Sequence, residues 1–203
     1  MTTVPPISQP AALEQRTFRA MLAAMSMPGT VEMLADANPA DATVALVAIA
    51  QSFLDHEVTF HVAAEGGSAL EDAILRRTGA RTAPLNRADY VFADPTHARR
   101  AVEQAVEGPL EEPELSATVV VRCASVGEGD LALRLTGPGV DGEIALRLGL
   151  GADVIAARNE RNGPFPTGID LLLVDAQGRL VGLPRSTQVE VLTPAMAGTE
   201  EVS

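Results

Sequence analysis

The sequence predicts an α/β protein with a single domain, in which helices flank a mixed β-sheet. Helical and strand patterns alternate through the first half of the chain, as they do in layered α/β folds. The second half is richer in short apolar strands separated by turns. The chain has 203 residues, 46% of them hydrophobic, which suits one ordinary domain and supplies enough apolar material for a core.

We expect this domain to span residues 11–193, with a flexible tail at each end. Residues 1–10 contain three prolines and few side chains that could pack. Residues 194–203 also have the small and polar composition of a chain end. We find no internal repeat and no long linker between the two tails.

The first half predicts the order helix, helix, strand, helix, strand, helix. A 3.6-residue period of apolar side chains begins at Ala11, and Pro28-Gly29 ends that first helix. Asp41 and Ser68 are candidate N-caps for the second and third helices, and Asp94-Pro95 opens the fourth. The later elements of this half are a helix at 42–54, a strand at 57–63, a helix at 69–78 with Glu71 at the capping-box position, a strand at 89–93 and a helix from 94 to about 106.

The second half predicts five strands and one helix. The run 117–123 is apolar enough for a buried strand, and a turn at 127–130 makes 131–136 its antiparallel partner. A helix is expected over 152–161. The last strands are 169–174 and 180–183, joined by a turn at 175–179, and then 187–192.

Charge and composition exclude several partners and cofactors. Fifteen basic against 27 acidic residues give a formal net charge of −12, which disfavours binding to nucleic acid and to membrane surfaces. All fifteen basic residues are arginine, so a Schiff-base lysine for pyridoxal phosphate and a lysine-containing phosphate-binding loop are both excluded. We expect no cofactor, and anion recognition would rely on arginine, backbone N–H groups or helix N-termini.

Cysteine and histidine do not predict a metal site or a nucleophile. Cys123 is the single cysteine and lies in an apolar run, which favours a core position. His56 and His61 point to opposite faces of one predicted strand, and His97 lies in the first turn of a helix, where we expect it to be exposed. With neither a signal-peptide pattern nor an apolar run long enough to cross a bilayer, the expected location is the cytoplasm.

A glycine-rich segment, residues 137–142, is the first candidate site. It matches the dinucleotide-binding pattern G-x-G-x-x-G after a predicted strand, but it comes late in the chain and Pro138 removes a loop N–H donor. The alternatives are a tight turn that needs positive φ angles, and a small anion-binding site at the strand end. That anion site would consist of Arg134, Thr136, Gly137 and Gly139.

Two further segments place polar side chains next to predicted strands. Asp170 follows a stiff loop of two prolines and two glycines and interrupts an apolar strand start, so it is either exposed or hydrogen-bonded. Arg185 and Thr187 lie in the short link before the last strand. Each segment is either structural or a contact for an anion or a partner, and we assign no catalytic residue.

Four segments in a fixed order resemble the H-subunit family of carbon–phosphorus lyase (PhnH), part of the bacterial machinery for phosphonate use. They are residues 18–29, 133–139, 164–171 and 184–190, so the resemblance extends over about residues 14–192. It implies a fold similar to that of pyridoxal-phosphate-dependent transferases without the cofactor machinery. It also implies work beside the G, I and J subunits, and a homodimer when the subunit is isolated.

The resemblance implies a function as well. In that family the assembly couples an alkylphosphonate to ATP, which gives alpha-D-ribose 1-methylphosphonate 5-triphosphate from methylphosphonate, and another subunit later cleaves the C–P bond. We therefore expect an accessory subunit that is not catalytic alone. The alternative is a stand-alone enzyme that binds a small anion, a phosphonate or a nucleotide in an arginine-lined pocket.

Overall fold

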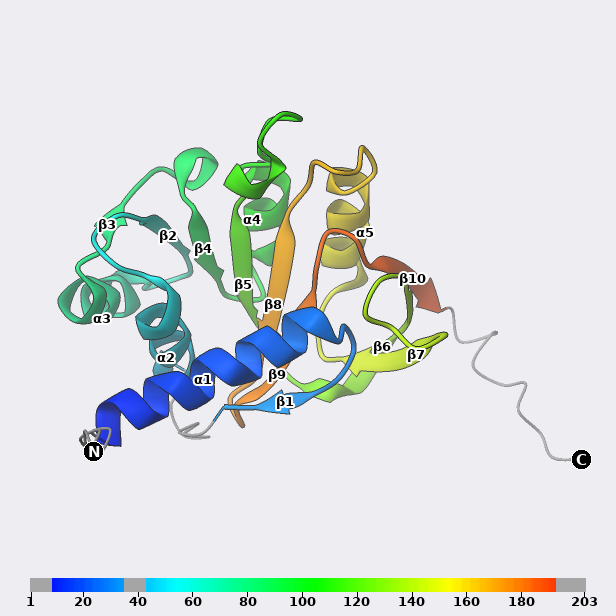
Figure 1. Cartoon of the computed structure of the whole chain (residues 1–203), viewed down its shortest axis with the longest axis horizontal. Helices are drawn as coiled ribbons and strands as arrows, with labels where there is room; N and C mark the ends of the chain where they lie inside the picture. Colours follow the sequence, from blue (N-terminus) through cyan, green and yellow to red (C-terminus); the bar gives the residue numbers. More distant parts are fainter. Residues whose placement is uncertain (1–8, 35–42, 193–203) are drawn as a thin grey trace, which may run out of the picture.

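A mixed seven-stranded β-sheet with helices on both faces forms the centre of the structure (Figure 1). This computed structural model describes residues 9–34 and 43–192. The helices are α1 (Gln9–Ser26), α2 (Thr43–Phe53), α3 (Ser68–Thr78), α4 (Ala98–Gln104) and α5 (Ala152–Arg161), with 3-10 turns η1 (Leu85–Arg87) and η2 (Pro113–Leu115). The strands are β1 (Glu32–Met33), β2 (Thr59–Ala63), β3 (Arg81–Thr82), β4 (Tyr90–Ala93), β5 (Thr118–Arg122), β6 (Val126–Thr136), β7 (Ile144–Leu148), β8 (Asp170–Val174), β9 (Arg179–Leu183) and β10 (Gln188–Leu192).

The large sheet has the strand order β1-β9-β8-β5-β4-β2-β3. Strands β3, β2, β4, β5 and β8 run parallel, whereas β9 is antiparallel to β8 and β1 is antiparallel to β9. The central strands are apolar on both faces: Val119, Val120 and Val121 of β5 are fully buried, as expected for strands covered by helices on each side. The predicted α/β class and mixed sheet are confirmed.

Two hydrophobic cores lie on opposite faces of this sheet. One contains buried side chains of α1, α2 and α3, with Phe60 of β2 and Phe92 of β4 in edge-to-face contact at 6.5 Å between ring centroids. The other contains α4, α5 and the inner face of a second sheet. Because successive side chains of a strand alternate between faces, His61 of β2 points to the α4 side.

The second sheet corrects one sequence prediction. Residues 131–136 do not pair with β5; they belong to β6, which pairs with β7 and β10 in an antiparallel three-stranded sheet of order β10-β6-β7. The predicted turn at 127–130 is an irregularity within β6, where the pairing register with β7 shifts between Val126 and Leu131. Strand β7 was not predicted, and β10 leaves the large sheet to join the small one.

Other element boundaries differ by a few residues. Helix α1 begins at Gln9, inside the predicted N-terminal tail, and α4 ends at Gln104. The N-cap of α3 is Gly67, and the Ser68 side chain makes no capping hydrogen bond, so the predicted Ser68 cap is wrong. The candidate cap Asp41 and residues 194–203 lie outside the described residues. In the described part of the chain, no helix is long and apolar enough to cross a membrane.

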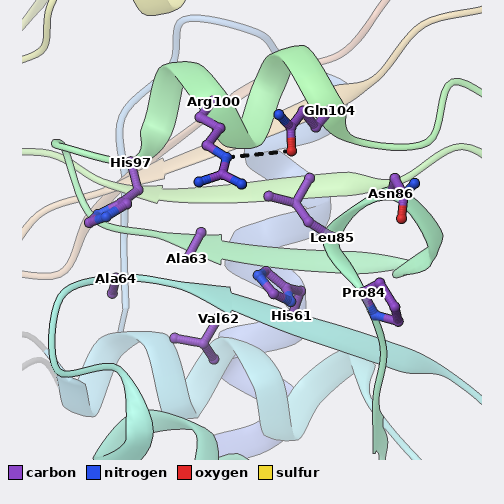
Figure 2. A pocket seen from close by; sticks show the side chains of 10 residues that line it. All are labelled: His61, Val62, Ala63, Ala64, Pro84, Leu85, Asn86, His97, Arg100 and Gln104. Carbon is purple, nitrogen blue, oxygen red and sulfur yellow. Dashed lines mark hydrogen bonds between the residues drawn. The ribbon is translucent and has the colours of Figure 1, made fainter.

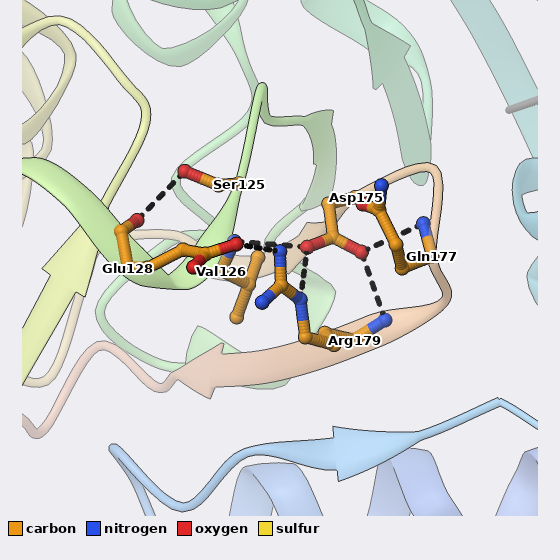
Figure 3. Close-up of polar contacts among 6 residues, drawn as sticks. All are labelled: Ser125, Val126, Glu128, Asp175, Gln177 and Arg179. Atoms are coloured by element: carbon orange, nitrogen blue, oxygen red, sulfur yellow. Dashed lines mark hydrogen bonds and ion pairs between the residues drawn. The ribbon is translucent and has the colours of Figure 1, made fainter. Parts of the chain in front are cut away.

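A buried carboxylate joins the two sheets (Figure 3). Asp175 follows β8, and its side chain is fully buried. It accepts hydrogen bonds from the backbone N–H groups of Val126, Gln177 and Arg179, each at 3.0 Å, and from Nε of Arg179 at 2.6 Å. Arg179 also pairs with the exposed Glu128 at 2.7 Å. The start of β6 in the small sheet is thus fixed to the β8–β9 turn of the large sheet.

Candidate functional site

The order in which the chain adds strands to the large sheet reverses at β2. The next strand along the chain, β3, lies on one side of β2, and β4 lies on the other. In open α/β sheets, ligands bind beyond the carboxyl ends of the strands next to such a reversal. Two hollows flank the carboxyl ends of β2 and β4, and they are the candidate site.

The larger hollow, which we call the α4 groove, has a volume of about 490 Å³. One wall is α4, the floor is β2, and the other wall is the segment around η1 (Figure 2). Its volume falls within the range of small-molecule sites. The groove is lined by His61, Val62, Ala63, Ala64, Pro84, Leu85, Asn86, His97, Arg100 and Gln104.

His61 is held by a backbone carbonyl. Its Nδ1 lies 3.0 Å from the carbonyl oxygen of Ala83. Because a carbonyl oxygen can only accept, Nδ1 carries the hydrogen, and Nε2 of the neutral ring is an acceptor. Within the described residues, Nε2 has no hydrogen-bond partner, so it is available to a ligand in the groove.

His97 is held by the carboxylate of Asp94. Its Nδ1 lies 2.8 Å from Oδ1 of Asp94. Asp94 also accepts the backbone N–H groups of His97 at 2.9 Å and of Glu65 at 3.0 Å. Burial alone would raise the pKa of Asp94, but the hydrogen bonds from His97 and Glu65 outweigh it and lower the pKa. Asp94 is therefore an ionised acceptor that directs Nε2 of His97 away from itself. The side chain of His97 is 36% exposed, so the expected exposure is confirmed only in part.

Arg100 supplies positive charge to the α4 groove. It lies one helical turn after His97, and its Nε is 3.5 Å from Oε1 of Gln104. Among the described residues, no carboxylate lies within ion-pairing distance of its guanidinium. Figure 2 shows this guanidinium pointing from α4 toward the strands, with the two imidazole rings on either side in that view. The groove can thus present one guanidinium and two imidazole Nε2 atoms to a ligand.

The smaller hollow lies on the α2–α3 side and has a volume of about 120 Å³. It is lined in part by the Gly66-Gly67 turn, by Arg122 at the end of β5, and by Asp94. Asp94 therefore stands between the two hollows. In residues 9–34 and 43–192, no group of three histidine, cysteine or acidic side chains could hold a metal ion.

The predicted anion residues Arg134 and Thr136 lie elsewhere, on β6 of the small sheet. They line a separate shallow hollow of about 470 Å³ with Glu143, Gln188 and Glu190. Arg134 forms a close ion pair with Glu190 and a second one with Glu143 at 3.7 Å. The hydrogen bond that Arg134 donates to the carboxylate of Glu190 raises the pKa of Arg134. Carboxylates of the same sheet thus already partner this guanidinium.

Gly137 and Gly139 lie in the β6–β7 turn, with φ angles of +117° and +81°. A Cβ on Gly139 would be 2.3 Å from the carbonyl oxygen of Ser26, and one on Gly137 would be 3.1 Å from that of Ser186. The turn therefore needs glycine for close backbone approach. Because it joins two antiparallel strands, the tight-turn interpretation is confirmed and the dinucleotide interpretation is wrong.

Asp170 and Arg185 form an ion pair with 2.8 Å between Oδ2 and Nη2. Asp170 also accepts the backbone N–H of Arg185 at 2.7 Å, and Nη1 of Arg185 donates closely to the carbonyl of Pro113. Thr187 is buried, and its hydroxyl has no hydrogen-bond partner in the described part of the chain. Asp170 is thus hydrogen-bonded, one of the two expected states. Arg185 does not line the hollow that Arg134 lines, and the role of both residues as anion or partner contacts stays a prediction.

The four segments that carry the family resemblance contact one another. Gly139 packs against Ser26 at the end of α1, and Gly137 packs against the Ser186–Thr187 backbone. The start of β8 pairs with Arg185 in the last segment. Much of the pattern that carries the resemblance therefore comes from a packing junction, the place where segments 18–29, 133–139, 164–171 and 184–190 contact one another. The α4 groove is built from residues outside these segments.

Comparisons with known proteins identify a family. A family model described as bacterial phosphonate metabolism protein (PhnH) matches residues 5–190. HtxG of Stutzerimonas stutzeri, named as a candidate C-P lyase subunit, is 37% identical over 179 residues, which are 88% of this chain and 86% of that protein. Among solved structures, alanine–glyoxylate aminotransferase from a Nostoc species has a TM-score of 0.30 and 18% identity. That match covers 76% of this chain and half of the aminotransferase.

Proposed function

Because the chain belongs to the PhnH family of bacterial phosphonate metabolism proteins, we propose that it is an accessory subunit of carbon–phosphorus lyase in the cytoplasm. In this role it works with the G, I and J subunits, which together couple an alkylphosphonate to ATP. The product from methylphosphonate is alpha-D-ribose 1-methylphosphonate 5-triphosphate. The isolated chain is proposed to form a homodimer.

The observation that carries this proposal is the 37% identity to HtxG over 88% of the chain. The match to the family model over residues 5–190 contains all five described helices and both sheets except the last two residues of β10. Exposed apolar side chains on α1 and β1 also support a role within an assembly: Leu22 is 50% exposed and Met33 is 57% exposed. Large exposed apolar side chains are suited to contact with another protein.

Co-purification tests the proposed subunit role. The tagged full chain is co-expressed with its cognate G, I and J subunits and isolated by its tag in buffer of moderate salt. We expect the three partners to co-elute in fixed ratio through a subsequent sizing column. Elution of the folded chain without any of them would overturn the proposal. Sedimentation equilibrium of the chain alone tests the homodimer.

The stand-alone alternative is favoured by one observation, the α4 groove with its unpaired Arg100. The two functions differ in what the purified chain can do alone. Incubation with ATP, magnesium and methylphosphonate, followed by phosphorus NMR, is expected to show no new phosphonate species. Turnover by the chain alone would favour the alternative.

A further inference from the structure

We propose that the α4 groove binds the tetrahedral oxyanion of a phosphonate or a phosphate, through Arg100, His61 and His97. The proposed function only guides the choice of methylphosphonate as the first probe. The site itself is inferred from the groove.

The charge of the groove favours an anion. The protein as a whole has a net charge of −12, yet Arg100 lines the groove without a carboxylate partner among the described residues. The neighbouring Arg99, on the same helix, is instead paired with Glu103 at 2.7 Å. Arg100 is an exposed residue at the edge of the groove. A guanidinium without a carboxylate partner suits oxyanions of this shape, because its planar N–H groups can donate two parallel hydrogen bonds.

Both imidazole rings are held so that Nε2 is the atom left for a ligand. The carbonyl of Ala83 fixes Nδ1 of His61, and the carboxylate of Asp94 fixes Nδ1 of His97. Nε2 of such a neutral ring can accept a hydrogen bond from the P–OH group of a hydrogen phosphonate or hydrogen phosphate ion. The two rings, one on the floor and one on a wall of the groove, thus bring two further ring nitrogens to the groove that Arg100 lines.

A metal ion fits the groove less well than an anion. Histidines held at Nδ1 by a carbonyl or carboxylate also occur in metal sites. The described residues, however, provide no third ligand to complete such a site, and the Arg100 guanidinium would repel a cation. The same three side chains therefore favour a ligand of negative charge.

The size and lining of the groove fit a ligand larger than the anion alone. A volume of about 490 Å³ exceeds what a single phosphate or phosphonate group fills. The apolar side chains of Ala63 and Leu85 also line the groove and can contact an alkyl substituent. Asn86 and Gln104 offer uncharged donors and acceptors at its rim.

Isothermal titration of the full isolated chain tests the site. The probes are methylphosphonate, inorganic phosphate and ATP in separate arms, because the same oxyanion chemistry can come from each source. The variants are Arg100→Gln, His61→Gln and His97→Gln. Arg99→Gln and His56→Gln are matched controls, since Arg99 is on the same helix and His56 is an exposed histidine, and neither lines the groove.

We expect at least one probe to bind with 1:1 stoichiometry. Arg100→Gln should weaken binding about tenfold or more, each groove histidine variant should weaken it several-fold, and both controls should stay within about twofold. The probe that binds most tightly identifies the source of the oxyanion. Circular dichroism of each variant confirms that it is folded.

Two results would overturn the site. One is that no probe binds to the folded wild-type chain at millimolar concentration, and the other is that Arg99→Gln weakens binding as much as Arg100→Gln. Either result leaves the subunit role intact if the chain still co-purifies with its partners. Loss of co-purification with binding retained would instead overturn only the subunit role.

Discussion

Replacement of Asp175 by alanine should remove a large part of the stability of the fold. The fully buried carboxylate accepts three backbone N–H groups and Nε of Arg179. Alanine leaves the three N–H groups without this acceptor, and of the three residues Val126 is fully buried, Arg179 is half-buried and Gln177 is exposed. Each buried unsatisfied donor costs about 1–3 kcal/mol, and loss of one member of a buried ion pair costs about 3–5 kcal/mol.

We therefore expect Asp175→Ala to lower the free energy of unfolding by about 3–5 kcal/mol, against a typical total of about 5–15 kcal/mol. For a chain of this length that corresponds to a fall in Tm of roughly 6–20 °C. Asp175→Asn should cost less. Its single oxygen can still accept from Gln177 and Arg179, which both donate to Oδ1, while its NH₂ faces the donor of Val126.

The assay is urea unfolding followed by far-UV circular dichroism, because the chain has no tryptophan. The matched control is Glu128→Gln, which removes the other carboxylate partner of Arg179. Glu128 is 67% exposed, so its loss should cost about 1 kcal/mol or less. If Asp175→Ala costs no more than Glu128→Gln, the sheets are not joined through this carboxylate.

Three further predictions follow from single residues. Burial, and then the negative charge of Asp175, raises the pKa of the Cys123 thiol to about 12. Ellman's reagent should therefore detect no reactive thiol in the native chain at pH 8 and one after denaturation; reaction of the native chain would contradict this. Gly139→Ala should lower the free energy of unfolding by about 2–5 kcal/mol in thermal unfolding, because its Cβ would collide with Ser26 at a residue of positive φ. The control Gly142→Ala, where φ is +69° but nothing lies within 4 Å of the new Cβ, should cost only about 1–2 kcal/mol; equal losses would refute the contact. Hydrogen bonds lower the pKa of Asp94 from 3.8, so ionised Asp94 stabilises the native state above about pH 4, and this stabilisation is lost as the pH falls further. The urea midpoint of Asp94→Asn should therefore fall less than that of wild type between pH 5 and pH 3, and parallel curves would contradict the assignment.

The central strands were predictable because their sequence carries its own signal. The apolar run in β5 leaves no polar face, so it fits only a strand covered on both sides. The helices between β2 and β5 were predicted from signals at their starts, Glu71 at the capping-box position and the pair Asp94-Pro95. The pairing of β6 was not predictable from the same local patterns. Consecutive strands are usually neighbours, but Gly129 lets the backbone of β6 approach Leu148 at a distance that no Cβ would permit, and β6 thereby pairs with β7.

The candidate site was predictable only in fragments. Residues of the α4 groove come from three segments, 61–64, 84–86 and 97–104, which no local motif connects. The one local signal was Asp94 three positions before His97, the spacing that lets the carboxylate hold the ring. The predicted anion residues were instead drawn from glycine and proline patterns. Such patterns mark where the backbone turns and packs closely, so they led to the packing junction.

The position of α1 has a consequence for how the protein folds during synthesis. The first helix packs on β9, and the carbonyl of Ala24 lies so near Gly182 that a Cβ there would be only 2.6 Å from it. Strand β9 is translated roughly 150 residues after α1, which takes about 8–30 s at ordinary ribosomal speeds. Throughout that interval Met21 and Ala24, fully buried in the finished protein, have no sheet to cover them. The nascent chain therefore exposes these apolar side chains, to which a chaperone can bind until the last strands leave the ribosome.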